Sequence, residues 1–406
     1  MEDHPRNTAT ERRWPYLAAA FVAMAVVSPY EYAWSSISPL ISNARGWTPA
    51  HLGAIFSLFV VFQSGASFPT GVLRDRYGPR ALTVVGGVLA GLGLVALSAG
   101  PLVLAVFGFG VVGSFGVGMV YSNCINVGSK WFPDKRGLAA GLIAGAFSWG
   151  SIPFVIWIRT TADEGTYPSI LVAMAAIVTA IIVGSGLVMR DPRPGWKPTI
   201  PAAAAGRMKA RPSSRQFAVR EALRTWQFWV TYVAFVLISG AGLMTIAKIV
   251  GFASATGHAA LVGTTAAVGL AVTNGFGRPV LGKLADRLGY EITMTGSFTL
   301  CGLFLLVMIA GESPFVFVFA ALAALFFWGP LFSLFPAISG YYYGADHAAA
   351  IYGVLYSAKM VGGLWGGWAS AVILERYGYE TAFVIGAVMA VVSGLLMVIV
   401  GRKPPA

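Results

Sequence analysis

Two stretches of the chain, GVLRDRYGPR (residues 71–80) and GKLADRLGYE (residues 282–291), share one pattern of glycine, leucine, aspartate, arginine and glycine. They begin 211 residues apart, and each follows a helix-length apolar run. Glycine lets helices approach closely, and the aspartates can pair with arginine or begin a helix. The repeat therefore predicts two similar halves around a central site. It also predicts two equivalent conformational loops, which contain Asp75, Arg76, Asp286 and Arg287.

The composition of the chain excludes an ordinary soluble domain. Of its 406 residues, 57% are hydrophobic and 11% are charged, and the mean hydropathy is +0.72. Soluble domains are about 25% charged. A soluble protein could not bury so much apolar surface, so lipid is the expected solvent.

Twelve apolar segments have the length of a membrane-spanning helix, which is roughly 20 residues. They are 15–40, 51–73, 81–99, 102–127, 138–158, 168–189, 226–250, 260–281, 292–310, 315–339, 351–373 and 381–401. The predicted fold is an all-α membrane protein with twelve transmembrane helices in two six-helix bundles. The N-terminal bundle covers residues 1–189, a polar linker covers 190–225, and the C-terminal bundle covers 226–406.

The basic residues predict how the chain is oriented in the membrane. The two tails and the loops after the even-numbered spans hold 22 of the 28 lysines and arginines. Short basic loops stay on the cytoplasmic side, so both termini and the linker should be cytoplasmic. The formal net charge of +12 is therefore explained by topology, and we expect no nucleic-acid partner.

Few residues suggest metal or catalytic chemistry. Cys124 and Cys301 lie inside apolar runs and are interpreted as packing residues. The four histidines are scattered without metal-ligand spacing, and no phosphate-binding glycine loop occurs. The sequence predicts neither a metal, nor a cofactor, nor an enzyme.

The repeated loops resemble a known signature. The pattern G-x-L-x-D-R-x-G-x-R after the second helix is that of the major facilitator superfamily, and residues 71–80 match it fully. The second copy ends in Glu291, where the signature has a basic residue. The resemblance implies the major facilitator fold.

Four further stretches resemble the oxalate:formate antiporter family. They are WFPDKRGLAAG (131–141), RTWQFW (224–229), NGFGRP (274–279) and SAKMVGGLWGG (357–367). The resemblance covers most of the chain outside the tails and linker. It implies a secondary transporter of small carboxylates in a bacterial inner membrane.

Two cations lie inside apolar spans. Arg278, in AVTNGFGRPVLG (271–282), is eight residues before Asp286, and Lys359 is eight residues after Ile351. Each is therefore ~12 Å from the cytoplasmic side at 1.5 Å per residue. A cation in hydrocarbon must face a partner or water, so each either binds an anionic substrate or forms a structural ion pair. In the resembling family, this arginine and this lysine bind the two ends of a small dicarboxylate.

An acid in the first span, Glu31 within SPYEYAW (28–34), complicates that expectation. It is a structural counter-ion, a proton-coupling carboxylate with a raised pKa, or a group that faces water. If it pairs with Lys359, the site has a net charge near +1, which favours a monoanion, or one anion with a proton. If it is protonated or remote, the site keeps +2 and suits a dianion. A third cation, Lys248, is interpreted as an interfacial residue.

Aromatic and amide side chains complete the predicted site. By resemblance the lining residues are Tyr32, Tyr121, Trp328, Phe332 and Tyr356; ordinary packing or an interfacial belt is the competing interpretation. Asn274 is an intramembrane amide that could bind substrate or another helix.

The function predicted from these observations is alternating-access transport of small carboxylates, by anion exchange of the oxalate/formate type. The alternative is a proton-coupled monocarboxylate symporter in which Glu31 carries the proton. The expected partners are small carboxylate anions, protons in the alternative mechanism, and the lipid bilayer, with the protein as a monomer.

Overall fold

The computed structural model describes residues 13–132, 136–193, 216–257, 259–344 and 347–402. All regular secondary structure in these segments is helical. The first helices, called here the N group, are α1 (Trp14–Val27), α2 (Pro29–Tyr32), α3 (Trp34–Arg45), α4 (Pro49–Gly65), α5 (Ser67–Ser98), α6 (Leu102–Leu104), the π-helix η1 (Ala105–Gly113), α7 (Ser114–Trp131), α8 (Arg136–Trp149), α9 (Ile152–Thr161) and α10 (Tyr167–Val188).

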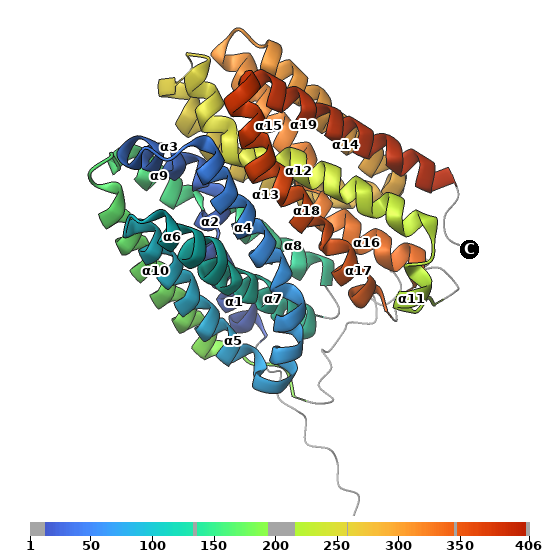
Figure 1. Cartoon of the computed structure of the whole chain (residues 1–406). Helices are drawn as coiled ribbons and strands as arrows, with labels where there is room; N and C mark the ends of the chain where they lie inside the picture. Colours follow the sequence, from blue (N-terminus) through green and yellow to red (C-terminus); the bar gives the residue numbers. More distant parts are fainter. Residues whose placement is uncertain (1–12, 133–135, 194–215, 258, 345–346, 403–406) are drawn as a thin grey trace, which may run out of the picture.

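The short helix α11 (Val219–Ala222) comes before the second set. That set, called here the C group, consists of α12 (Trp226–Ala255), α13 (Ala259–Leu288), α14 (Tyr290–Ala310), α15 (Pro314–Trp328), α16 (Leu331–Tyr343), α17 (Ala348–Tyr356), α18 (Ala358–Leu364), the π-helix η3 (Trp365–Ala369) and α19 (Ser370–Arg402). Figure 1 shows the N group, in blue and green, beside the C group, in yellow to red.

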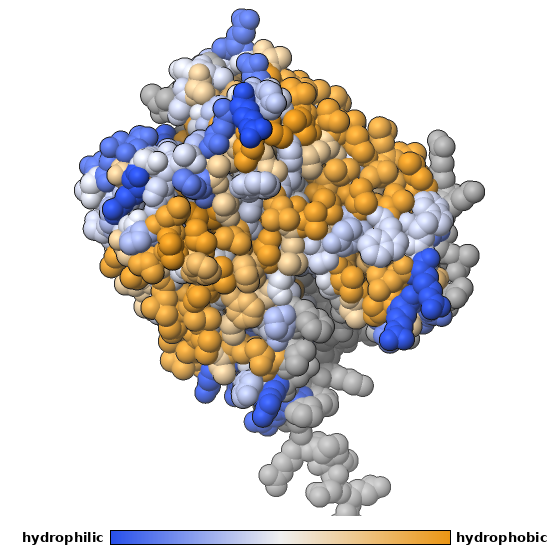
Figure 2. Space-filling model, in the orientation of Figure 1, coloured by the Kyte–Doolittle hydropathy of each residue, from blue (hydrophilic) through white to orange (hydrophobic). Residues whose placement is uncertain are grey.

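The surface of the molecule suits lipid. Eight stretches of helix in the described residues are long and apolar enough to cross a membrane, or nine if the bent pair formed by α1–α2 and α3 counts as one span. Large apolar side chains such as Phe107, Ile292 and Leu395 are more than half exposed. Figure 2 shows such residues over the flanks of both groups, with polar residues gathered toward the ends. The prediction of an all-helical membrane protein is confirmed.

The two repeated loops share a backbone turn. Gly78 and Gly289 are equivalent residues of the repeat, and both take positive φ, +75° and +96°. Only glycine adopts this conformation readily, which explains why both copies of the motif keep it. The exposed side chains of Arg76 and Arg287 flank these turns, whereas those of Asp75 and Asp286 lie outside the described side chains.

Several helices are broken near the middle of the molecule. Pro29 follows the break between α1 and α2, and the path of α1–α2 bends by 44° into α3. Pro330 lies between α15 and α16, and Ser357 lies between α17 and α18. Proline ends the regular hydrogen bonding of a helix, and broken helices inside a membrane protein are tolerated where they line a cavity.

The two groups pack together more closely at one end than at the other. Around the end that holds Arg45 and Gly46, α4 packs on α18, η3 and α19, and α12 packs on α3. In the middle, α13 packs on α8 and α9. Toward the end that holds α1, α11 and α17, here called the linker end, the groups diverge, as Figure 1 shows. There Asn126 on α7 and Val354 on α17 are exposed.

Backbone approaches backbone where α4 meets α18 and η3. A Cβ atom added to Gly367 would lie 2.5 Å from the carbonyl oxygen of Gly53. The hydroxyl of Ser57 donates to the carbonyl of Gly363 at 2.9 Å and accepts from the backbone N–H of Trp368 at 2.8 Å. Small residues at helix interfaces allow such contacts in membranes.

A charged contact closes the same end, here called the closed end. The carboxylate of Glu375 in α19 accepts a hydrogen bond of 2.7 Å from the backbone N–H of Ala50, in the first turn of α4. A carboxylate is favourable at a helix N-terminus because it faces the positive end of the helix dipole. Lys248 is near this carboxylate and is 9% exposed. α12 therefore turns Lys248 toward the protein interior at this end of the molecule, and its interpretation as an interfacial residue stays a prediction.

We predict that Gly367→Val opens the closed end. Overpacking costs about 1–3 kcal/mol, so the opening equilibrium should rise about tenfold. The measurement is the labelling rate of an introduced Ser38→Cys on α3 by a membrane-impermeant maleimide, against a low background because Cys124 and Cys301 are buried.

Gly184→Val is the matched control, since a Cβ there meets no atom within 4 Å. An unchanged labelling rate in Gly367→Val would show that this contact does not hold the end closed.

Candidate substrate site between the two groups

Arg278 lies within α13 and is only 2% exposed. Its guanidinium donates hydrogen bonds to the backbone carbonyl of Ala144 and, at 3.2 Å, to the hydroxyl of Ser148, both in α8 of the N group. Asn274, one turn earlier in α13, accepts at 3.2 Å from Nη2 and at 3.3 Å from Nε. No described carboxylate forms an ion pair with Arg278. Its hydrogen bonds are satisfied, but its charge is not balanced.

Lys359 is held differently. Its ammonium group lies 3.1 Å from Oε2 of Glu31 and 3.2 Å from Oε1 of Gln63. The side chains of Lys359 and Glu31 are each 1% exposed, so this is a buried ion pair between α18 of the C group and α2 of the N group. Glu31 therefore does not face water in this structure, and its role as a structural counter-ion or a proton-coupling carboxylate stays a prediction.

Phe332 connects the two cations. The Arg278 guanidinium carbon lies 4.9 Å from the centre of the Phe332 ring, and the Lys359 nitrogen lies 5.2 Å from it. The negative face of an aromatic ring attracts cations at such distances. Trp328 packs edge-on against Phe332 at 5.4 Å, and its indole N–H donates to the carbonyl of Ile238 at 2.7 Å. Trp328 therefore supports Phe332 and offers no free donor to a substrate.

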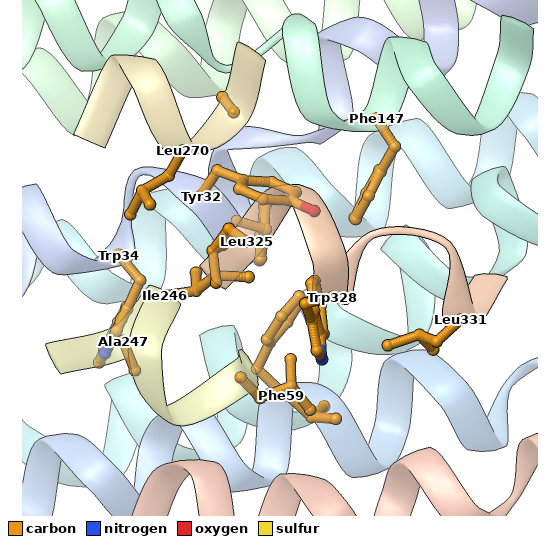
Figure 3. Close-up of a cluster of buried hydrophobic side chains, with 14 of the residues drawn as sticks. Tyr32, Trp34, Phe59, Phe147, Ile246, Ala247, Leu270, Leu325, Trp328 and Leu331 are labelled. Carbon is orange, nitrogen blue, oxygen red and sulfur yellow. The ribbon is translucent and has the colours of Figure 1, made fainter. Parts of the chain in front are cut away.

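The hydroxyl of Tyr32 joins the groups around Arg278. Its oxygen accepts from Asn274 at 2.9 Å, from Ser148 at 3.2 Å and more loosely from Arg278 at 3.4 Å. Figure 3 shows Tyr32 with its hydroxyl among apolar side chains that include Phe147 and Trp328. The ring of Phe147 meets Tyr32 edge-on at 5.9 Å. The polar cluster is therefore enclosed by a hydrophobic shell, which strengthens its electrostatic interactions.

Three polar atoms beside the ion pair lack a hydrogen-bond partner among the described residues. They are Oε1 of Glu31, Nε2 of Gln63 and the hydroxyl oxygen of Tyr356. The Tyr356 hydroxyl is approached by Tyr121 and Gln63, outside ordinary hydrogen-bond geometry, and it interacts electrostatically with Glu31. Tyr356 therefore lies between the ion pair and the N group. A buried polar group without a partner is uncommon and indicates water, an ion or a ligand in the working protein. The described side chains include no group of three or more that could hold a metal ion.

Comparison with known proteins identifies the family of this chain. A model of the Major Facilitator Superfamily matches residues 16–256 and 233–406. The chain belongs to the Major Facilitator Superfamily. This facilitator is a multi-pass membrane transporter, in keeping with its apolar helices.

The relatives of the facilitator are transporters and not enzymes. It is 29% identical over 386 residues to the oxalate:formate antiporter of Oxalobacter formigenes. The matched region covers 94% of this chain and 90% of the antiporter. It is 24% identical to the apicoplast pyruvate carrier 1 of Toxoplasma gondii, over 72% of this chain and 64% of the carrier. It is 28% identical to human monocarboxylate transporter 11, over 44% of this chain and 39% of that protein.

The structure brings most of the predicted site residues together. Arg278, Asn274 and Tyr32 form one cluster, Lys359 and Glu31 form a second, and Phe332 lies between them. Tyr356 borders the second cluster, where Tyr121 approaches it from the N group. Trp328 lies behind Phe332. The exposed arginines of the repeated loops, Arg76 and Arg287, form no contact with these clusters among the interactions described.

The sequence analysis missed Gln63 and the contacts of α8. Gln63 lies 211 residues before Asn274, the same offset as the two loops, so the repeat itself equates these amides. Each accepts a hydrogen bond from one of the buried cations. An amide at the same place in both copies was therefore a usable signal. No sequence signal could have indicated the carbonyl of Ala144, because its contact with Arg278 depends on how α8 packs on α13.

We predict that Lys359→Gln lowers the stability of the facilitator by about 3–5 kcal/mol, because it leaves Glu31 buried and unpaired. The double variant Glu31→Gln/Lys359→Gln removes both charges and should recover most of that loss. Thermal unfolding of the purified protein in detergent compares the single variants Lys359→Gln and Glu31→Gln with the double variant. The exposed Lys283→Gln is the control for loss of one basic charge. Additive losses in the double variant would contradict a coupled pair.

Proposed function

We propose that this facilitator exchanges small carboxylate anions across a bacterial inner membrane by alternating access, as a monomer. The observation that carries the proposal is Arg278, a buried cation without a carboxylate partner whose hydrogen-bond acceptors come from both groups. A planar guanidinium suits a carboxylate because it donates two parallel hydrogen bonds. The match to the oxalate:formate antiporter over most of the chain supports an exchange mechanism.

The proposed architecture has twelve spans. Several spans are made of successive pieces, such as α1–α2–α3 or α15–α16. The helices α5 and α19 each turn at a glycine with positive φ, Gly78 and Gly378. The proposed bundles are residues 1–189 and 226–406, joined by the linker 190–225. With the basic tails and linker in the cytoplasm, the linker end, where the groups diverge, faces the cytoplasm. The tightly packed closed end faces outward.

The proposed cycle uses the contacts between the groups. A carboxylate that enters from the open end accepts the hydrogen bonds that the Arg278 guanidinium otherwise donates to Ala144 and Ser148. Because those acceptors belong to α8 of the N group, exchanging them for substrate changes how the groups are held together. The repeated loops, with Asp75, Arg76, Asp286 and Arg287, are proposed to guide the movement of helices at the linker end.

Exchange follows from the charge of the empty site. Lys359 is neutralised by Glu31, whereas Arg278 is not, so one unbalanced positive charge stays buried. An unbalanced charge in a low-dielectric interior is costly, and an anion removes that cost. The loaded site therefore closes more easily than the empty one, which favours return with a second anion. The sequence left two charges open for the site, near +1 if Glu31 pairs with Lys359 and +2 if it is protonated or remote, and the ion pair favours the first.

The aromatic residues have proposed roles in this site. Phe332 presents its ring to both cations and would limit where a small anion can lie. Tyr32, Tyr356 and Tyr121 provide hydroxyl groups, and Asn274 orients Arg278. Trp328 positions Phe332 from behind.

We predict that Arg278→Gln abolishes exchange, with a fall of at least about a hundredfold, because a buried charged hydrogen bond is worth about 3–5 kcal/mol. Arg278→Lys should restore less than a tenth of the wild-type exchange rate, since an ammonium group cannot donate the two parallel hydrogen bonds of a guanidinium. The measurement is uptake of labelled formate, glycolate and oxalate into proteoliposomes, with and without internal carboxylate.

The exposed Arg224→Gln is the matched control for loss of one arginine. Full exchange by Arg278→Gln would overturn the assignment of the site. Uptake into vesicles without internal carboxylate, driven by an inward proton gradient, would show symport in place of exchange.

A further inference from the structure

We propose that Glu31 sets the charge of the substrate, so that the site accepts monoanionic carboxylates and excludes dianions such as oxalate. The second polar group of the substrate is then an uncharged oxygen, as in a 2-hydroxy or 2-oxo acid. This proposal rests on the proposed function and narrows it to one substrate class.

The charges of the described site carry the inference. Glu31 and Lys359 cancel one another across 3.1 Å, and both are 1% exposed. Arg278, 2% exposed, has only uncharged acceptors, namely a carbonyl, two hydroxyls and an amide. The buried site therefore has a net charge of +1. One carboxylate brings it to zero, whereas a dicarboxylate leaves one negative charge uncompensated.

The low exposure of these groups gives the charge balance its effect. Water screens charges poorly where side chains are almost fully buried, so one excess charge is far more costly than at a surface. A dicarboxylate could enter only if Glu31 moved away from Lys359 or took up a proton. Movement of Glu31 would leave its charge buried without a partner. Protonation of Glu31 would couple the entry of each dianion to the uptake of a proton.

The polar atoms beside the ion pair suggest what the other end of the substrate is. Gln63 Nε2 is a donor, Glu31 Oε1 is an acceptor, and the Tyr356 hydroxyl is either. Gln63 and Tyr121 both approach the Tyr356 hydroxyl, but none of the three atoms forms a hydrogen bond of ordinary geometry among the described residues. A hydroxyl or oxo oxygen can satisfy such atoms without adding charge. The charge of the Lys359 ammonium is already balanced by Glu31, so it is not available to balance a second carboxylate.

Glu31→Gln tests the inference because it keeps the shape of the side chain and removes its charge. Wild-type and variant proteins are reconstituted at neutral pH, and vesicles loaded with each unlabelled anion are assayed for counterflow of labelled formate, glycolate and oxalate. We expect the wild type to exchange formate and glycolate in preference to oxalate. In Glu31→Gln the oxalate-to-glycolate rate ratio should rise at least about tenfold, because Lys359 then offers its charge to the second carboxylate.

Three further variants control the interpretation. Glu31→Asp keeps the charge and should keep the preference for monoanions. The double variant Glu31→Gln/Lys359→Gln restores the net charge of +1 and should lower the ratio again. Glu164→Gln removes an exposed acid outside the site and should leave the ratio unchanged. If Glu31→Gln is unstable, inhibition of wild-type glycolate exchange by unlabelled oxalate and by lactate gives the same comparison, with lactate expected to inhibit more strongly.

The outcomes separate this inference from the function on which it rests. Oxalate exchange by the wild type as fast as glycolate exchange, or a ratio that does not change in Glu31→Gln, would overturn the inference and leave carboxylate exchange intact. No exchange of any carboxylate by the wild type would overturn the proposed function itself.

Discussion

The cost of burying positive charge governs the centre of this molecule. Arg278 and Lys359 are almost completely removed from solvent, in a region that otherwise consists of apolar helices. Such groups persist only where polar atoms or opposite charges compensate for lost hydration. The protein uses two different solutions: Lys359 receives a carboxylate, whereas Arg278 receives only dipoles. The difference leaves one unbalanced charge at the place where the two groups of helices meet.

The compensating atoms also explain why the helices break where they do. Glu31 and Tyr32 lie on the four-residue helix α2, Phe332 follows Pro330, and Lys359 follows the break at Ser357. These breaks turn side chains from several helices toward one point. Because each cation has partners in the opposite group, some of the hydrogen bonds that satisfy the charges also hold the groups together. In the proposed cycle, substrate binding and movement of the groups are thus parts of one process.

Much of this arrangement could be predicted from the sequence. Arg278 and Lys359 stand out because charge is rare in apolar spans, and the offset of 211 residues indicates two related halves. The partner of Glu31 could not be predicted, since pairing depends on how α2 and α18 meet across the groups. The inward direction of Lys248 and the backbone acceptor of Trp328 likewise depend on tertiary packing. Gln63 was within reach of sequence reasoning, because the repeat equates it with Asn274.

In the proposed cycle, the single unbalanced charge of Arg278 would make the empty carrier sensitive to voltage. In alternating access the barrier moves while the site stays near the middle, so the potential felt by the site changes from that of one side to that of the other. In the proposed orientation a membrane potential that is negative inside draws the empty, positive site toward the inward-facing state, by up to about 2.3 kcal/mol per 100 mV. A bound monoanion removes this bias. The voltage of the cell would therefore hold the empty protein with its site open to the cytoplasm, ready for the next outgoing anion.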